Sequence, residues 1–209
     1  MRRTRFLLFA LFPSLCFANE VALDNDYVRV TRGIASCTSA AAPGCGERVI
    51  VAIGDIELQS GDSPLKMTRG DIAVFQSGES FQQPIGEGFF EVVIKPHRPG
   101  VLSPAEVIPP EKNTMRYDGT CFFIFEEKLE PGDTRARHSH SQRVVIQLNR
   151  TRLQQWPDGA PAFFVDVVPE KPLFNPPVIH EVKNVGDTPL RGIIIEFKPE
   201  GQALCERTP

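Results

Sequence analysis

The two halves of this chain repeat each other, and this repeat constrains the fold more than any other feature of the sequence. The segment ERVIVAIGDIELQSGD, which starts at Glu47, aligns with QRVVIQLNRTRLQQWPDG, which starts at Gln142. Further along, FFEVVIKP, which ends at Pro96, aligns with RGIIIEFKP, which ends at Pro199. An internal repeat of this length predicts one small domain that is present twice.

The repeated segments have the pattern of short β-strands. Runs rich in Val, Ile and Phe, such as RVIVAI, CFFIFEE, RVVIQL and AFFVDVV, are separated by turn sequences such as SGD, PGD and PDG. No window of the sequence has a convincing 3.6-residue apolar period. We therefore predict an all-β chain with two tandem domains. Closure of each domain into a barrel or a double-sheet jelly roll would protect the exposed strand edges.

A proline-rich interval, KPHRPGVLSPAEVIPPEKN, separates the halves. We predict a first domain over residues 19–99, a linker over 100–112 and a second domain over 113–209. His97 lies at the start of this interval and is expected to be solvated rather than to bind a metal.

The N-terminus has the features of a cleaved export signal. Arg2, Arg3 and Arg5 precede the apolar run FLLFALF, and CFA followed by NE places small residues before a cut after Ala18. A signal peptide over residues 1–18 predicts a periplasmic or secreted protein. No segment reaches the roughly 20 consecutive apolar residues that a spanning helix needs, so no membrane span is expected.

The charge of the chain limits its partners. The net charge is −3 at pH 7, and cleavage of the signal would remove three further positive charges. An acidic chain is a poor match for nucleic acid or anionic lipid. The expected partner is a small-molecule ligand or substrate, and a homodimer is left open.

The cysteines that remain after cleavage are even in number, which predicts disulfides in an exported protein. The sequence permits three pairings. We favour Cys37 with Cys45, which closes a short Gly/Ala/Ser loop, and Cys121 with Cys205, which ties the first strand of the second half to the C-terminal tail. Buried free thiols are the alternative.

Three of the four histidines lie in two short motifs of the second half. In ARHSHSQRVV, His138 and His140 are two residues apart, and alternate residues of a strand point to the same face. Forty residues later, VIHEVKN supplies His180 at the start of another expected strand. Three neutral imidazoles that meet at one point form a metal site with open coordination positions, as catalytic metals require.

These motifs resemble those of the cupin superfamily. The first cupin motif, a glycine, five residues and His-x-His, is matched by Gly132, DTRAR and the pair His138 and His140. The second motif, a histidine and an asparagine separated by three residues, is matched by His180, EVK and Asn184. The resemblance covers most of the second half and implies a small jelly-roll barrel with the histidines directed into its interior. It also implies that the first half is a degenerate copy, so that the chain is a bicupin.

One residue of the family pattern is absent. Cupins usually carry a glutamate four or five positions after the second histidine of the first motif, where this chain has Val144 and Val145. A three-histidine site, which some cupin-like thiol dioxygenases resemble, competes with a decayed site that holds no metal. We favour one divalent transition metal: iron, manganese, zinc, nickel or copper. Without a carboxylate ligand such a site is more positive, which favours an anionic co-ligand or substrate.

Two further residues are candidates for substrate binding. Arg143 is placed to hold a substrate carboxylate near the metal, and Gln147 lies on the same face of the expected strand. Arg48 occupies the position of Arg143 in the first half, which makes a structural role the simpler hypothesis for both arginines. In the first half, the positions that match the three histidines carry Pro43, Cys45 and Ser77.

Three functions stay open from the sequence. The first is a metal-dependent enzyme, such as an iron dioxygenase or a Lewis-acid isomerase or hydrolase. The second is a periplasmic binding protein that uses the barrel cavity without turnover. The third is a structural bicupin with a vestigial site. The fold does not choose among them, since one barrel can host many unrelated functions.

Overall fold

The computed structural model describes residues 20–33, 35, 46–60, 63–85, 88–95 and 112–198. The regular elements that these residues form are sixteen β-strands and no helix, so the predicted all-β class is confirmed. Within this part of the chain, no helix is long and apolar enough to cross a membrane.

Some predicted features lie outside the described residues: the signal peptide over 1–18, nearly all of the linker over 100–112, Cys37, Pro43, Cys45, His97 and Cys205. Both disulfide pairs therefore stay predictions. Cys121 is buried directly before a strand of the second half.

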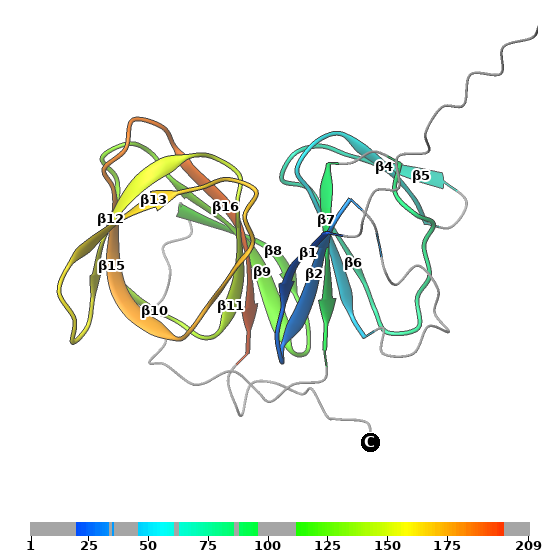
Figure 1. Ribbon diagram of the computed structural model, residues 1–209, viewed down its shortest axis with the longest axis horizontal. Helices are drawn as coiled ribbons and strands as arrows, with labels where there is room; N and C mark the ends of the chain where they lie inside the picture. Colours follow the sequence, from blue (N-terminus) through cyan, green and yellow to red (C-terminus); the bar gives the residue numbers. More distant parts are fainter. Residues whose placement is uncertain are drawn as a thin grey trace, which may run out of the picture.

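The strands of the first half form one large sheet and one small one (Figure 1). The large sheet is antiparallel, with the strand order β1-β2-β7-β3-β6, and the hairpin of β4 and β5 forms a second, two-stranded sheet. The bounds are β1 Glu20–Asp24, β2 Val28–Arg32, β3 Arg48–Ala52, β4 Ile56–Ser60, β5 Ser63–Met67, β6 Ile72–Phe75 and β7 Phe89–Ile94.

The strands of the second half form two full sheets that enclose a jelly-roll barrel, which Figure 1 views end-on. A five-stranded sheet has the order β14-β11-β16-β9-β8, and a four-stranded sheet has the order β10-β15-β12-β13. The bounds are β8 Asn113–Asp118, β9 Phe122–Leu129, β10 Thr134–His140, β11 Arg143–Gln147, β12 Thr151–Pro157, β13 Phe163–Val167, β14 Leu173–Asn175, β15 Val178–Asn184 and β16 Leu190–Phe197.

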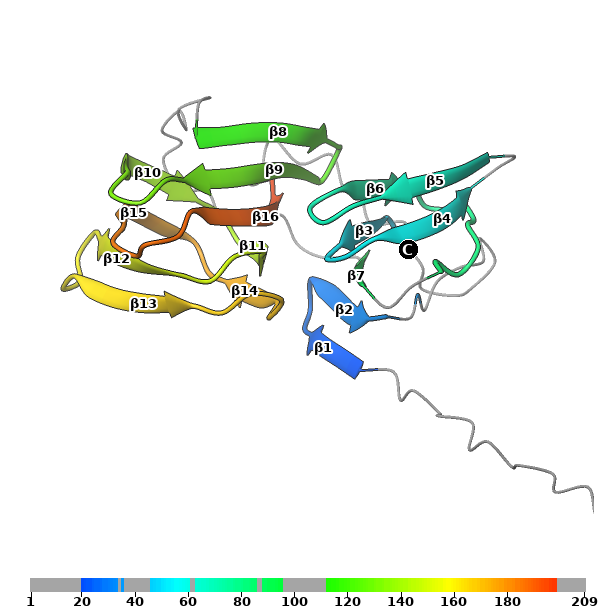
Figure 2. The ribbon, with the colours of Figure 1, turned by 90° about the horizontal axis from the view of Figure 1, so that it is seen from above.

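No sheet of the described residues mixes strands from the two halves, and the two sets of strands lie side by side in Figure 2. This separation agrees with the predicted division of the chain into two domains. The domain bounds themselves stay predictions, because residues 96–111 lie outside the described part.

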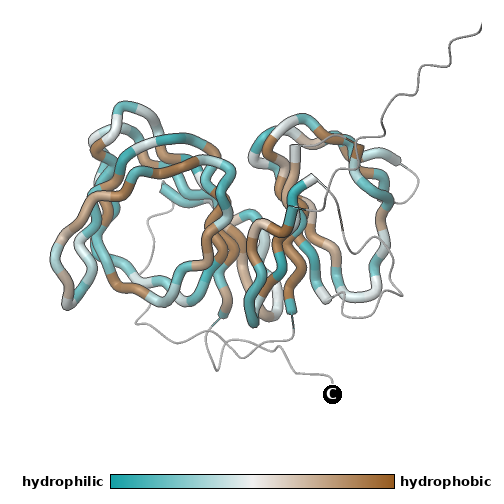
Figure 3. The backbone as a smooth tube through the Cα atoms, in the orientation of Figure 1, coloured by the Kyte–Doolittle hydropathy of each residue, from teal (hydrophilic) through white to brown (hydrophobic). Residues whose placement is uncertain are grey.

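The two five-stranded sheets pack against each other between the barrels (Figures 1 and 2). The largest hydrophobic cluster of the described residues draws on both sheets, with Val49 and Val92 from the first half and Phe122, Ile146 and Ile195 from the second. Figure 3 shows the most hydrophobic strands gathered in this middle region. We call this cluster the shared core. Burial of apolar surface there stabilises both halves together.

The strands β11 and β16 of the five-stranded sheet in the second half are buried on both faces, which explains their sequence. Along β16, Ile193 and Ile195 belong to the shared core, whereas Ile194 faces the interior of the barrel. A strand with two buried faces is apolar without interruption, as in GIIIEF, rather than alternating. A polar residue inside such a run, such as Glu196, therefore needs a partner.

Candidate metal centre

An irregularity in β10 decides which of its side chains face inward. β10 pairs with β15 so that His138 lies opposite His180, and the register shifts between Arg135 and His138. This β-bulge leaves Ala136 and Arg137 exposed and turns Arg135 to the buried side. In a regular strand, Arg135 would point away from the histidines.

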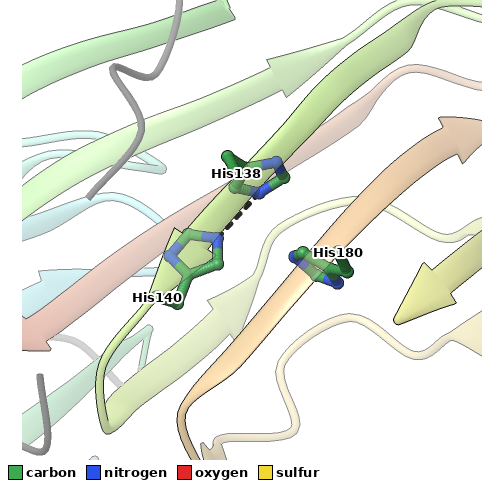
Figure 4. A group of neighbouring side chains, drawn as sticks. All are labelled: His138, His140 and His180. Atoms are coloured by element: carbon green, nitrogen blue, oxygen red, sulfur yellow. Dashed lines mark hydrogen bonds between the residues drawn. The ribbon is translucent and has the colours of Figure 1, made fainter. Parts of the chain in front are cut away.

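The three predicted histidines lie together inside the second barrel. Figure 4 shows His138 and His140 on β10 turned toward His180 on β15. Each side chain is at most 5% exposed, and ligand nitrogens of all three rings lie within 4.8 Å of one another. The Nε2 atoms of His138 and His140 are 3.0 Å apart. The structure thus brings together the full histidine set predicted from the sequence.

Each histidine holds an oxygen atom with its Nδ1. The Nδ1 of His138 lies 2.8 Å from the Ala136 carbonyl oxygen, which the bulge turns toward the ring. The Nδ1 of His140 lies 2.7 Å from Glu196 Oε2, and that of His180 lies 3.1 Å from Gln155 Oε1. The Ala136 carbonyl oxygen can only accept, so the proton of His138 lies on Nδ1 and its Nε2 carries a lone pair. Gln155 Oε1 and the ionised form of Glu196 assign His180 and His140 in the same way.

When Glu196 is ionised, the 3.0 Å contact between His138 Nε2 and His140 Nε2 brings two lone pairs together at the centre of the cluster. When Glu196 is protonated, the same contact is the hydrogen bond that Figure 4 draws. The Nε2 of His180 is buried and has no hydrogen-bond partner. Metal–imidazole bonds are roughly 2.0–2.1 Å long, so two nitrogens of one ion lie at most about 4.2 Å apart. The 3.0 Å pair satisfies this limit, whereas ligand nitrogens separated by up to 4.8 Å would have to approach each other on binding. Three neutral imidazoles are a donor set that suits a divalent transition metal.

Burial keeps the three rings neutral. It is the largest cause that lowers the pKa of His138 to about 4 and the pKa of His180 to about 2. It also lowers the pKa of His140 well below its usual range, with a further contribution from the Arg143 guanidinium. Neutral imidazole is the form that binds a metal.

Glu196 on β16 supplies the cluster with a carboxylate that the sequence analysis did not identify. Its Oε2 contacts His140 Nδ1, and its Oε1 accepts a hydrogen bond from Ser141 N at 2.7 Å. Burial raises the pKa of this carboxyl to about 7. Since Glu196 contacts Nδ1 and not Nε2, it orients the ligand from behind rather than replacing the missing glutamate ligand. The sequence could have pointed to Glu196, because it is the only acidic residue in the apolar run GIIIEF.

The first half has an apolar residue in the place of Glu196. Its β7 pairs with β3 so that Val93 lies opposite Arg48, as Glu196 lies opposite Arg143 in the second half. The arginine is thus present in both halves, whereas the residue directly opposite it is a carboxylate in the second half and Val93 in the first.

Both arginines hold backbone carbonyl groups. Arg48 donates from Nη2 to the carbonyl oxygens of Gln76 and Glu79, and its guanidinium lies beside two phenylalanine rings. Arg143 donates from Nη1 to the carbonyl oxygens of Ser141 and Pro176, at 3.2 and 2.9 Å. These contacts support the structural role for both side chains.

A cavity of about 60 Å³ adjoins the histidines in the second barrel. Its polar lining consists of His140, His180, Glu127, Arg143, Gln147, Gln155 and Asn175. The two candidates for substrate binding, Arg143 and Gln147, are therefore both on its wall. The sequence analysis missed Glu127, whose Oε1 lies 2.6 Å from Nη1 of the buried Arg135.

Asn184 of the second motif has a structural position. Its Nδ2 donates to the carbonyl oxygens of Leu129 and Thr188, and its Oδ1 accepts from the Thr151 hydroxyl at 2.7 Å. It ties the end of β15 to β9 and β12 and does not contact the histidines.

Within the described residues, the three histidines are the only group of three or more His, Cys, Asp or Glu placed to hold an ion. Ser77, one of the residues that match the histidines in the first half, is exposed in a turn.

No protein-family model and no curated protein matches the sequence. Solved structures do match. The Cupin 2 conserved barrel domain protein from Leptotrichia buccalis has a TM-score of 0.54 and 11% identity, over 87% of this chain and 88% of that chain. A structure from work on the substrate binding mode of an oxalate decarboxylase has a TM-score of 0.53 and 15% identity. The match covers 85% of this chain and 70% of that chain. One on the Mn(II) centres of the Bacillus subtilis oxalate decarboxylase has a TM-score of 0.50 and 15% identity, over 85% and 70%. These likenesses confirm the cupin fold that the motifs implied.

Proposed function

We propose that the second barrel binds one divalent transition metal through His138, His140 and His180 and acts on a small anionic molecule in the adjoining cavity. The observation that carries this proposal is the arrangement of the three rings. Each Nδ1 is held by an oxygen acceptor, which leaves the Nε2 atoms for a metal. The buried Nε2 of His180 has no hydrogen-bond partner, and such an atom is costly in a protein interior unless a bound group compensates it.

The cavity supports a small, negatively charged substrate. At about 60 Å³ it has room for only a few non-hydrogen atoms. The ligand set is neutral, so a divalent ion there would keep its full charge and favour an anion. Arg143 lines the same cavity, and its guanidinium would add to this preference. Oxalate, the compound named for two of the structural neighbours, is the first anion to test.

When bound, the metal would supply Lewis-acid activation or, if it is iron, redox chemistry with dioxygen. The protein groups would hold and orient the substrate. Glu127 is a carboxylate on the cavity wall with a fixed ion-pair partner, Arg135, and is suited to hold a proton-bearing group of the substrate. A binding protein without turnover is the second candidate.

We also propose that the protein is exported, on the evidence of the signal sequence over residues 1–18. The compartment would be the periplasm or the medium, in which the two predicted disulfides would form.

Metal analysis tests the proposed function. Wild-type protein, purified without chelators and offered iron, manganese, zinc, nickel and copper, should bind one ion per chain at better than micromolar affinity. His140→Ala should lose this ion, because one of three ligands is removed, and His97→Ala should retain it. If the wild type binds none of the five metals, the site is vestigial. If His97→Ala loses the metal to the same extent, the site has been assigned to the wrong residues.

A further inference from the structure

The turn between β13 and β14 in the second barrel is held by two arginines of the first barrel. Arg32, at the end of β2, places Nη2 2.7 Å from Glu170 Oε2. Arg69, in the turn between β5 and β6, places Nη1 2.7 Å from Glu170 Oε1. These two ion pairs lower the pKa of the Glu170 carboxyl, with the Arg69 hydrogen bond as the largest cause.

Arg69 also holds a second point of the second barrel. Its Nη2 donates to the carbonyl oxygen of Leu148, the residue directly after β11. Its Nη1 donates to the carbonyl oxygen of Ile53 in its own barrel at 2.5 Å. One guanidinium therefore fixes the β13–β14 turn and the end of β11 to the backbone of the first barrel.

Glu170 and Leu148 both lie next to a residue that lines the cavity. The Glu170 N–H donates to the Gln147 carbonyl oxygen at 2.8 Å, and Gln147 lines the cavity. Next to them, β14 pairs with β11 so that Asn175 lies opposite Arg143, and both of these residues also line the cavity.

The backbone of Glu170 is in a conformation that needs such support. Its φ is +58°, in the left-handed region, and it is the only non-glycine residue of the described chain with a positive φ. L-residues other than glycine adopt this region at an energetic cost, and they keep it where the surrounding contacts fix it. Here the backbone N–H is held by Gln147 of the same barrel, and the side chain is held by Arg32 and Arg69 of the first barrel.

We infer that Arg69, together with Arg32, is a positioning residue of the first barrel that holds the wall of the cavity in the second barrel through Glu170 and the Leu148 carbonyl group. The first barrel thereby sets the shape of the cavity in the second barrel. This role does not require that the cavity binds a metal.

The expected effect of losing these contacts is local. The side chains of Arg32, Arg69 and Glu170 are each about a third exposed, and ion pairs at this exposure contribute little to global stability. Their loss should open the turn and the end of β11 without unfolding the barrels.

Hydrogen exchange on the metal-free, full-length protein tests the inference. In Arg69→Met, exchange should rise by about tenfold in peptides that cover residues 143–148 and 168–176, while peptides of β15 and β16 stay protected. Glu170→Gln, a substitution of equal size, should open residues 168–176 alone.

A matched control is available at the opposite edge of the same interface. Gln76 Nε2 donates to the Tyr117 hydroxyl at 2.9 Å, and this bond also joins the two barrels. Tyr117 lies on β8, and β8 and β14 are the two edge strands of the five-stranded sheet. Tyr117→Phe should therefore leave exchange at the cavity wall unchanged.

A conservative variant separates positioning from general loosening. Lysine carries the charge of arginine but not its fork of donors, so Arg69→Lys should restore protection at residues 168–176 and leave 143–148 open.

The side-chain amide resonances of Gln147 and Asn175 should shift in Arg69→Met and not in Tyr117→Phe. Unchanged exchange at the wall in Arg69→Met would overturn the inference. So would an equal rise in Tyr117→Phe, or a uniform rise over all peptides in Glu170→Gln.

Discussion

The two barrels of this chain have the same five-stranded sheet but differ in what closes it. In the second barrel a four-stranded sheet lies across the interior, whereas in the described part of the first barrel the β4–β5 hairpin does. The interiors differ as well. The interior of the first barrel is mainly apolar, with residues such as Ile50, Leu58, Phe75 and Phe89 around the buried Arg48 and Glu91, whereas the second encloses the histidines and a polar cavity.

This difference shows what a buried polar site demands of its barrel. Apolar side chains can fill an interior without fixed partners, because dispersion and the hydrophobic effect have little directionality. Buried polar groups need hydrogen-bond partners at defined positions. Ala136, Gln155 and Glu196 supply these partners from three different strands. Two of these strands, β10 and β12, belong to the four-stranded sheet, and the third, β16, belongs to the five-stranded sheet.

The barrels are alike where they meet. Each five-stranded sheet contributes one face to the shared core, so neither sheet would be covered if the halves separated. An exposed apolar face of this kind promotes aggregation. Each barrel therefore covers an apolar face that the other would otherwise expose.

The largest predicted effect tests whether the halves are one folding unit. Phe122 is fully buried in the shared core, and Phe122→Ala should lower the free energy of unfolding by about 3–5 kcal/mol. Urea denaturation followed by hydrogen exchange should show that both halves lose stability. Met115→Ala, at an exposed position of the neighbouring strand β8, should change stability by no more than about 0.5 kcal/mol. Loss of stability in the second half alone would show that the barrels fold independently.

Acid should destabilise the second barrel more than the first. The pKa of His138 is lowered to about 4 in the folded protein, so below about pH 6.5 the unfolded chain takes up the proton first. The stability contributed by the neutral ring is complete above pH 6.5 and falls as the pH drops toward 4. The loss is roughly 3 kcal/mol for this residue, and His140 and His180 act in the same direction.

Glu196 offsets part of this loss. Its pKa is raised to about 7, so the stability from its neutral form is present below about pH 4.5 and is lost as the pH rises toward 7. Three histidines outweigh one carboxyl, and metal-free protein should therefore unfold at lower urea at pH 5 than at pH 7. His138→Gln should reduce the difference between the two pH values. Equal urea midpoints for the wild type would show that the rings are not buried in neutral form.

The two equivalent arginines should have similar effects on stability. Arg48→Met and Arg143→Met each remove hydrogen bonds to backbone carbonyl groups, and each should destabilise the protein by about 1–3 kcal/mol. Thermal unfolding of the two variants provides the comparison. If Arg143→Met retains full stability but loses affinity for a bound anion, this arginine serves the ligand and the structural explanation is wrong.

The smallest predicted effect concerns the residue at which the halves differ. Glu196→Gln should weaken metal binding by about 10- to 100-fold, because a carboxylate that accepts from a ligand histidine raises its basicity and fixes its orientation. Titration calorimetry with Mn²⁺ or Zn²⁺ measures this change. Glu126→Gln alters another buried carboxylate, which binds Arg116 and Arg191, and should leave metal affinity unchanged. If Glu196→Gln has the metal affinity of the wild type, Glu196 does not support metal binding and serves only in packing.

The sequence by itself predicted the all-β class, the duplication and the three histidines that the structure brings together. Strand periodicity and turn residues are local signals, and a repeat of these signals predicts two similar domains. His138 and His140 share a face because of their spacing, and the motif around His180 supplied the third ligand by resemblance. The absence of a glutamate at Val144 and Val145 was likewise visible in the sequence.

Only the tertiary structure decided what surrounds these ligands. Glu196 reaches His140 from 56 residues away, and Arg69 reaches Glu170 from 101 residues away. The bulge in β10 turns Arg135 inward against the simple alternation of the strand. Strand order, register and bulges depend on the packing of the whole sheet, because each strand gains its hydrogen bonds and buried area from distant partners. Local patterns specify which face a side chain occupies, but the folded sheets specify which side chain lies opposite.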